Sequence, residues 1–182
     1  IGACDWSSDV CSSDLPDGGA TLLARAERLP ALAAARVNGA AMHVLDYEPM
    51  WNPANHAVST VLPGLLALAE SAGAEASGRD LATAFAIGVE AQARLRLASR
   101  QFEPGDLVFH PPGVVGPIGS AVACATLLGL DVATTAQAVG IAASRAGGIL
   151  ANVGSMTKAL HCGGAAADGM EAALLAKGGF TA

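Results

Sequence analysis

The chain has 182 residues, of which 52% are hydrophobic and only 4% are aromatic. This composition excludes an intrinsically disordered chain, which has too little hydrophobic surface to offset the entropy lost on folding. Sixteen acidic residues outnumber ten basic ones, which argues against a nucleic-acid-binding domain with its basic surface. The longest nearly apolar stretch covers residues 119–130, whereas a transmembrane helix needs about 20 residues. We therefore expect neither nucleic acid nor a membrane as a partner.

The first 18 residues differ in character from the rest of the chain. They contain four aspartates and no basic residue, and the triplet Ser-Ser-Asp recurs at residues 7–9 and 12–14 without helical or strand periodicity. The segment also lacks the basic and apolar regions of a signal peptide. We interpret residues 1–18 as a non-native, adapter-derived segment, or alternatively as a disordered natural terminus, and residues 19–182 as the folded domain.

From Gly19 onward the sequence predicts helices, because it is written mostly in alanine and leucine and shows no long alternation with a period of two. Ser77, followed three residues later by Asp80, has the pattern of a capping box, and Gly73 is a plausible end of the preceding helix. A loop rich in proline and glycine covers residues 104–117. The predicted helices cover residues 21–29, 31–45, 59–72, 77–100, 118–128, 132–146 and 157–177. The expected fold is an all-α, multihelical single domain.

The first of three polar clusters covers residues 43–56, where two prolines rule out a regular helix. Asp46 and His56 are suited to form a pair in which the carboxylate fixes the imidazole tautomer, as acid–base catalysis requires. The alternative is that Asp46 and His56 only cap the backbone. His43 is expected to pack against this loop and support it.

The second cluster is His110 with the prolines and glycines that follow it. Backbone N–H groups at the start of a helix can receive an anion, so Gly113 and Gly116 are candidates to bind a substrate carboxylate. His110 would then donate or accept a proton. The alternative is a plain turn that leads into a helix.

The third cluster surrounds Lys158, one of only two lysines in the chain. A lysine among small residues at a helix start is a candidate to bind a substrate carboxylate, and His161 lies one helical turn away. Cys124 and Cys162 stand isolated among small residues. We expect them to be free core residues, which indicates a reducing, cytoplasmic setting.

Together these clusters resemble the MmgE/PrpD family. The matching segments follow one another in the family's order from about residue 20 to residue 182. They are Asn38-Gly39, HVLDYE at 43–48, His56, FHPPGVVG at 109–116, LGLD at 128–131 and TKALHCG at 157–163.

The resemblance implies a large helical domain, here truncated at its C-terminus, and a smaller α+β lid domain that this chain lacks, usually in a homodimer. It implies a lyase that acts on a small di- or tricarboxylate by acid–base catalysis without a cofactor. Catalytic roles fall on Asp46, His56, His110 and Lys158, and Lys158, Gly113, Gly116 and His161 are expected to contact the substrate.

The expected reaction is that of a hydro-lyase, the dehydration of a 2-methylcitrate-like hydroxy acid. The alternatives are a carboxy-lyase of the cis-aconitate type, an isomerase or epimerase, and an inactive helical fragment or scaffold. A further hypothesis is a metal-dependent enzyme with His43, Asp46, His56 and His110 as ligands. Because no tight His-x-x-His spacing supports this hypothesis, we expect no metal.

Overall fold

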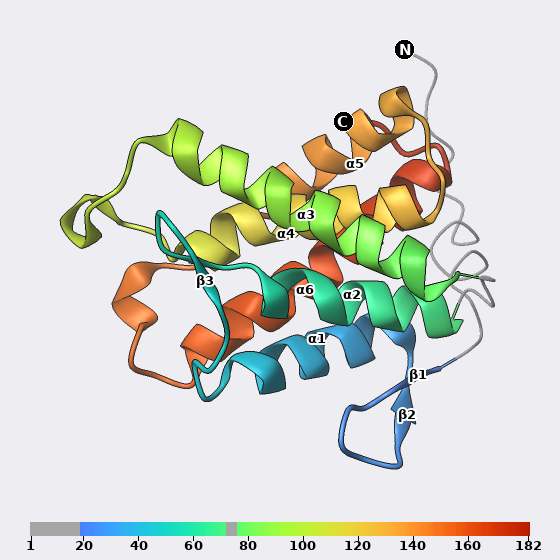
Figure 1. Cartoon of the computed structure of the whole chain (residues 1–182), viewed down its shortest axis with the longest axis horizontal. Coiled ribbons are helices and arrows are strands. Elements are labelled where there is room, and N and C mark those ends of the chain that lie inside the picture. The colour runs from blue at the N-terminus through green and yellow to red at the C-terminus, as the bar shows by residue number, and fades with distance from the viewer. Residues whose placement is uncertain (1–18, 72–75) are drawn as a thin grey trace.

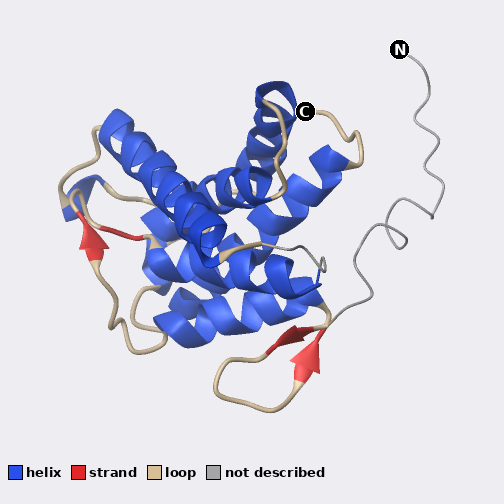
Figure 2. Cartoon of the chain, turned by 45° about the vertical axis from the view of Figure 1, so that its right-hand side comes forward, coloured by secondary structure: helices blue, strands red, loops and turns tan. Residues whose placement is uncertain are grey.

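The computed structural model describes residues 19–71 and 76–182. Within them the chain is a bundle of helices with two short pairs of antiparallel strands at opposite ends (Figures 1 and 2). The α-helices are α1 (Ala31–His43), α2 (Val58–Ser71), α3 (Gly78–Ser99), α4 (Pro111–Leu127), α5 (Val132–Ser144) and α6 (Thr157–Lys177). The strands are β1 (Ala20–Thr21) with β2 (Arg28–Leu29) and β3 (Met50–Trp51) with β4 (Asn55–His56), and the 3₁₀ helices are η1 (Pro104–Asp106) and η2 (Leu150–Asn152). The all-α prediction is confirmed.

Helix α6 is the centre of the bundle, because it packs against α1, α2, α4 and α5. Small residues permit this close packing. A Cβ atom added to Gly169 in α6 would lie 2.3 Å from Cβ of Ser120 and 2.4 Å from the carbonyl oxygen of Pro117, both in α4. The core therefore consists largely of alanine with few aromatic side chains, as the composition suggests. No helix in the described part of the chain is long and apolar enough to cross a membrane.

Several helix limits follow local sequence signals. The Ser77 hydroxyl accepts the N–H of Asp80 at 3.2 Å, and the Asp80 carboxylate accepts the N–H of Ser77 at 2.9 Å, which confirms the capping box. Helix α6 covers the predicted range, residues 157–177. Cys124 and Cys162 are buried free thiols, as expected. The predictions for residues 1–18 and for Gly73 lie outside the described residues.

The prediction of a helix over residues 21–29 is wrong, because these residues form the β1–β2 hairpin. Ala20 pairs with Leu29 and Thr21 with Arg28. The side chain of Asn38 in α1 accepts the N–H of Leu23 at 2.9 Å and donates to the carbonyl oxygen of Thr21 at 2.9 Å. These tertiary hydrogen bonds override the local helix propensity.

The predicted loop over residues 104–117 is also too long, because α4 begins at Pro111. Prolines are favourable in the first turn of a helix, where an N–H group has no intrahelical partner. The N–H of Gly113 donates to the carbonyl oxygen of His110 at 2.9 Å. Residues 113–119 therefore belong to the helix, and the expected open row of N–H groups for an anion is not formed there.

The packing of α6 predicts opposite effects for two of its glycines. Gly169→Ala should lower the free energy of unfolding by about 1–3 kcal/mol, because the new methyl group would overlap backbone atoms of α4. Gly164→Ala should raise it by about 0.5–1 kcal/mol, because a Cβ there would meet only ordinary contacts, the nearest at 3.5 Å from Arg36. Urea unfolding of both variants tests the pair, and equal effects would contradict the packing argument.

Candidate active site

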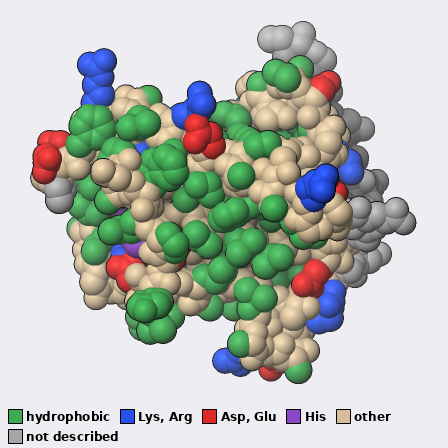
Figure 3. All heavy atoms as spheres, in the orientation of Figure 1, with side chains coloured by type: hydrophobic (Ala, Val, Ile, Leu, Met, Phe, Trp, Pro, Cys, Tyr) green, Lys and Arg blue, Asp and Glu red, His purple; other side chains and the backbone are tan. Residues whose placement is uncertain are grey.

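The three predicted polar clusters meet at one end of the bundle, on the left in Figure 1. Lys158 Nζ, at the start of α6, lies 2.7 Å from Oδ2 of Asp46, and Nε2 of His56 lies 3.1 Å from Oδ1 of the same carboxylate. The predicted contact between Asp46 and His56 is thus confirmed. Figure 3 shows histidine, acidic and basic side chains together in this region of the surface, bordered by hydrophobic ones.

Asp46 is held in its place by the turn that follows α1. Its φ of 56° lies in the left-handed region, which aspartate tolerates better than most residues. Its N–H donates to the carbonyl oxygen of His43 at 3.0 Å. The hydrogen bond from Lys158, and then the charges of His56, Lys158 and His43, keep the pKa of Asp46 below its usual range despite some burial. Asp46 is therefore a carboxylate that binds Lys158 and orients His56.

Glu48, to which the sequence analysis gave no role, is the buried anchor of the cluster. Its side chain is 6% exposed, and Oε1 lies 2.9 Å from Nδ1 of His43. The hydroxyl and the N–H of Ser59 also donate to it, at 2.5 and 2.9 Å. Burial alone would raise the pKa of Glu48, but the hydrogen bonds from His43 and Ser59 outweigh it and the pKa is lowered. Since the carboxylate accepts, Nδ1 of His43 carries the proton.

His56 lies between the two carboxylates, with Nδ1 3.6 Å from Oε1 of Glu48. Burial, and then the charge of His43, lower the pKa of His56 more than Asp46 and Glu48 raise it. The imidazole is accordingly neutral at pH 7 and able to accept a proton. Its ring meets that of His43 edge to face, with centroids 4.6 Å apart.

Helix α3 holds the segment that carries His56, through polar contacts that the sequence analysis did not find. Buried Asn55 donates to Oε1 of Gln92 at 2.9 Å, and Gln92 donates to the hydroxyl of Thr60 at 2.9 Å. The guanidinium of buried Arg96 donates to the carbonyl oxygen of Ala54 at 3.3 Å. Because α3 is distant in sequence, no local signal reveals these contacts.

His110, the residue before α4, is 4% exposed. Its N–H donates to the carbonyl oxygen of Gly148 at 2.8 Å, and its Nδ1 lies 3.1 Å from Nδ1 of His161. Burial, followed by the charges of His161, His43 and Lys158, lowers the pKa of His110 to about 3. Like His56, it is a neutral imidazole, and the charge of Lys158 helps to lower the pKa of both rings.

The predicted glycine contacts divide into two groups. Gly113 lines a cavity of about 270 Å³ together with His161. Gly116 is buried where α4 meets α2 and α6, since a Cβ there would lie 2.8 Å from Thr60 and 2.9 Å from Ala165. Gly116 therefore lies in the interface between the helices and not in the polar cluster. Its small size permits the close packing of α4 against α2 and α6.

His43, Glu48 and His56 each offer one ligand atom within 4.8 Å of the others, a set that could hold a metal ion. This set differs from the one considered from the sequence, because Glu48 replaces Asp46 and His110. The same Glu48 oxygen already accepts hydrogen bonds from His43 and Ser59. Nδ1 of His56, by contrast, is buried without a hydrogen-bond partner among the described residues.

The lowered histidine pKa values predict that acid destabilises the chain. In the unfolded chain the histidines titrate near 6.5, whereas His56, His110 and His161 titrate lower in the fold. As the pH falls below about 6.5 the unfolded state binds protons that the folded state does not, so the free energy of unfolding decreases.

Urea midpoints measured at pH 7.5, 6.5 and 5.5 should fall in that order, and the fall should be smaller for His110→Gln. Asp46 and Glu48 also titrate below their usual range. Their protonation therefore lowers the free energy of unfolding only at still lower pH. A midpoint that stays constant or rises between pH 7.5 and 5.5 would contradict the burial of neutral imidazoles.

Comparisons with known proteins agree with the family resemblance. The cis-aconitate decarboxylase of Mus musculus is 46% identical over 151 residues, which cover 82% of this chain and 31% of the relative. The protein of the same name from Homo sapiens gives the same values. The cis-aconitate decarboxylase of Aspergillus terreus is 31% identical over 185 residues, 97% of this chain and 38% of the relative. The chain thus spans 31–38% of the length of these relatives.

The MmgE/PrpD N-terminal domain matches residues 3–182. The match includes most of the segment that we interpret as non-native, which lies outside the described residues. It also includes every residue of the polar cluster, from His43 to His161. The chain therefore belongs to the MmgE/PrpD family.

Proposed function

We propose that this chain supplies the helical side of the active site of a lyase that decarboxylates a cis-aconitate-like tricarboxylate. The observation that carries the proposal is that Lys158 and neutral His56 both contact the carboxylate of Asp46, in the same cluster as neutral His110. The names of the relatives favour decarboxylation over the dehydration of a 2-methylcitrate-like acid, which remains a prediction from the sequence.

Lys158 would hold a carboxylate of the substrate. Its side chain is 18% exposed and its partner Asp46 is 52% exposed, so a ligand can reach this ion pair from solvent. Loss of CO2 leaves an electron pair on carbon, and delocalisation onto a neighbouring carboxylate places the negative charge near the ammonium group. A fixed cation at that position stabilises the charge as it develops.

The electron pair must then receive a proton, and a neutral imidazole beside the substrate can deliver one from one ring nitrogen while its other nitrogen takes up a proton from a neighbouring group. Both His56 and His110 are neutral at pH 7 because of burial. A positioned acid of this kind contributes about 10²–10⁴ to the rate. Of the two, His110 is the proposed donor, because it does not contact Asp46 or Glu48, whereas His56 is held between them.

The surroundings of the cluster support a site that is covered during reaction. Large apolar side chains are exposed in the segments that carry it, among them Leu45, Tyr47, Phe109, Met156 and Leu160. The relatives extend far beyond the matched region. We propose that a part of the protein outside this chain covers the cluster and excludes water, which strengthens the electrostatic interactions inside.

The proposal predicts large losses of activity for two variants. Residues 19–182 would replace the matching segment of the mouse relative, and the chimera would be assayed for CO2 release from cis-aconitate. Lys158→Ala and His110→Ala should each lower kcat/KM at least about 100-fold. Lys177→Ala removes the other lysine, at the end of α6, and should leave the rate unchanged.

Retention of most of the activity by both Lys158→Ala and His110→Ala would contradict the proposal. So would a folded chimera that releases no CO2. The same preparation, tested with 2-methylcitrate and followed by proton NMR, decides between the two lyase reactions, since dehydration forms an alkene without CO2.

A further inference from the structure

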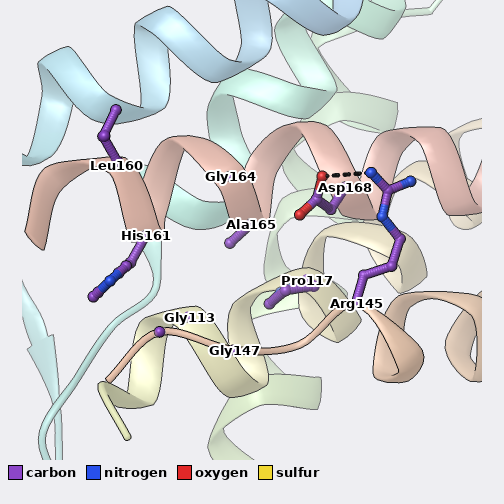
Figure 4. Close-up of a pocket in the computed structure, with 10 residues that line it drawn as sticks. Gly113, Pro117, Arg145, Gly147, Leu160, His161, Gly164, Ala165 and Asp168 are labelled. Carbon is purple, nitrogen blue, oxygen red and sulfur yellow. Dashed lines mark hydrogen bonds and ion pairs between the residues drawn. The ribbon is translucent and has the colours of Figure 1, made fainter. Parts of the chain in front are cut away.

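The cavity that Gly113 and His161 line lies between α4, α6 and the segment that joins α5 to η2 (Figure 4). Its volume is about 270 Å³. Arg145 and Asp168 lie at one end, joined by an ion pair of 2.9 Å, and His161 points from α6 at the other end. Asp46 and Glu48 line a separate hollow. His161 is therefore the side chain that faces this cavity and also contacts the polar cluster, through His110.

The contact between the two histidines constrains their protons. Nδ1 of His110 and Nδ1 of His161 are 3.1 Å apart, and a hydrogen bond between two neutral imidazoles requires one donor and one acceptor. Both rings titrate below their usual pKa, first because of burial. His161, His43, Lys158 and His56 then lower the pKa of His110, and His43 that of His161. When His161 donates, His110 carries its own proton on Nε2.

The backbone is shaped around the ring of His161. Gly148 has a φ of +112°, and a Cβ atom there would lie 2.9 Å from Cγ and Cδ2 of His161. The neighbouring carbonyl oxygen of Gly147 would lie 2.1 Å from a Cβ on Gly113. Gly148 also accepts the N–H of His110. The backbone at Gly148 thus packs against the ring of His161 and accepts a hydrogen bond from His110. A side chain at Gly113 or Gly148 would disturb this packing.

We propose that His161 is a proton relay that connects solvent in this cavity with His110. The proposal rests on the lyase function above. As Nε2 of His110 gives its proton to the carbon that lost CO2, Nδ1 of His110 takes the proton from Nδ1 of His161. Nε2 of His161 takes a proton from water in the cavity. Both rings stay neutral and exchange tautomers, and one solvent proton enters for each proton delivered to carbon.

After product release the starting tautomers return. Nε2 of His110 takes a proton from solvent on the side of the substrate, its Nδ1 proton moves back to His161, and His161 releases one proton from Nε2 to the cavity. The net reaction consumes one proton for each CO2 formed. With the relay, protons reach His110 while the substrate side of the site is covered.

The relay is tested in the chimera with variants that separate packing from proton transfer. His161→Phe keeps a ring against Gly148 but has no nitrogen that could bind or release a proton. It should lower kcat at least about 10-fold, which is part of the effect of a positioned acid, and it should change KM little. Gly164→Ala alters the cavity lining without a titratable group and should leave kcat unchanged. Circular dichroism and urea unfolding show whether each variant folds.

His161→Ala adds a readout that a structural role would not give. Imidazole in the buffer should restore activity to this variant, whereas thiazole, a ring of similar size without an N–H group, should not. Equal rescue by both compounds, or wild-type kcat in His161→Phe, would overturn the relay. If His110→Ala and Lys158→Ala lose activity while the His161 variants keep it, the relay fails and the proposed lyase site stands.

The tautomers themselves can be measured in the 182-residue chain. Nitrogen-15 NMR at pH 7 should show His110 neutral with its proton on Nε2, and His161→Phe should release this preference and give a mixture of tautomers. An unchanged tautomer of His110 in that variant would count against the relay.

Discussion

The ion pair between Lys158 and Asp46 joins the start of the central helix to the turn after α1, and the rest of the site depends on it. It can form because α6 approaches α1 and α4 through small residues. A bundle with larger interface side chains would move Lys158 and His161 away from the loop that carries Asp46 and His56. The alanine-rich, aromatic-poor composition is thus a condition for the site as well as for the fold.

Two layers of carboxylate act differently on the histidines. Asp46, half exposed, contacts Lys158 and His56, whereas buried Glu48 contacts His43 and Ser59. Deep hydrogen bonds fix ring orientation and tautomer, and the outer carboxylate remains within reach of a ligand. This arrangement holds the imidazoles of the cluster in preorganised positions.

Local signals explain which features were predictable from the sequence. The capping box at Ser77 could be predicted from neighbouring residues, and so could the placement of Asp46 and His56 in one loop. Lys158 could be singled out because the chain has only two lysines. The hairpin at residues 20–29 depends on Asn38 in another element, and the role of Glu48 arises from burial against α2. The Gln92 contact with Asn55 also joins distant segments. No spacing in the sequence encodes such tertiary contacts.

The charge balance of the site also links binding to chemistry. Without a ligand, burial and the nearby cation hold His56 and His110 neutral. A ligand with several carboxylates would bring negative charge to the same space, and a nearby opposite charge favours the protonated form of an imidazole. Bound carboxylates would therefore oppose the lowering of the pKa of His56 and His110 by burial. The affinity of such a site for an anion and the pKa values of its histidines are linked, because the same charges determine both.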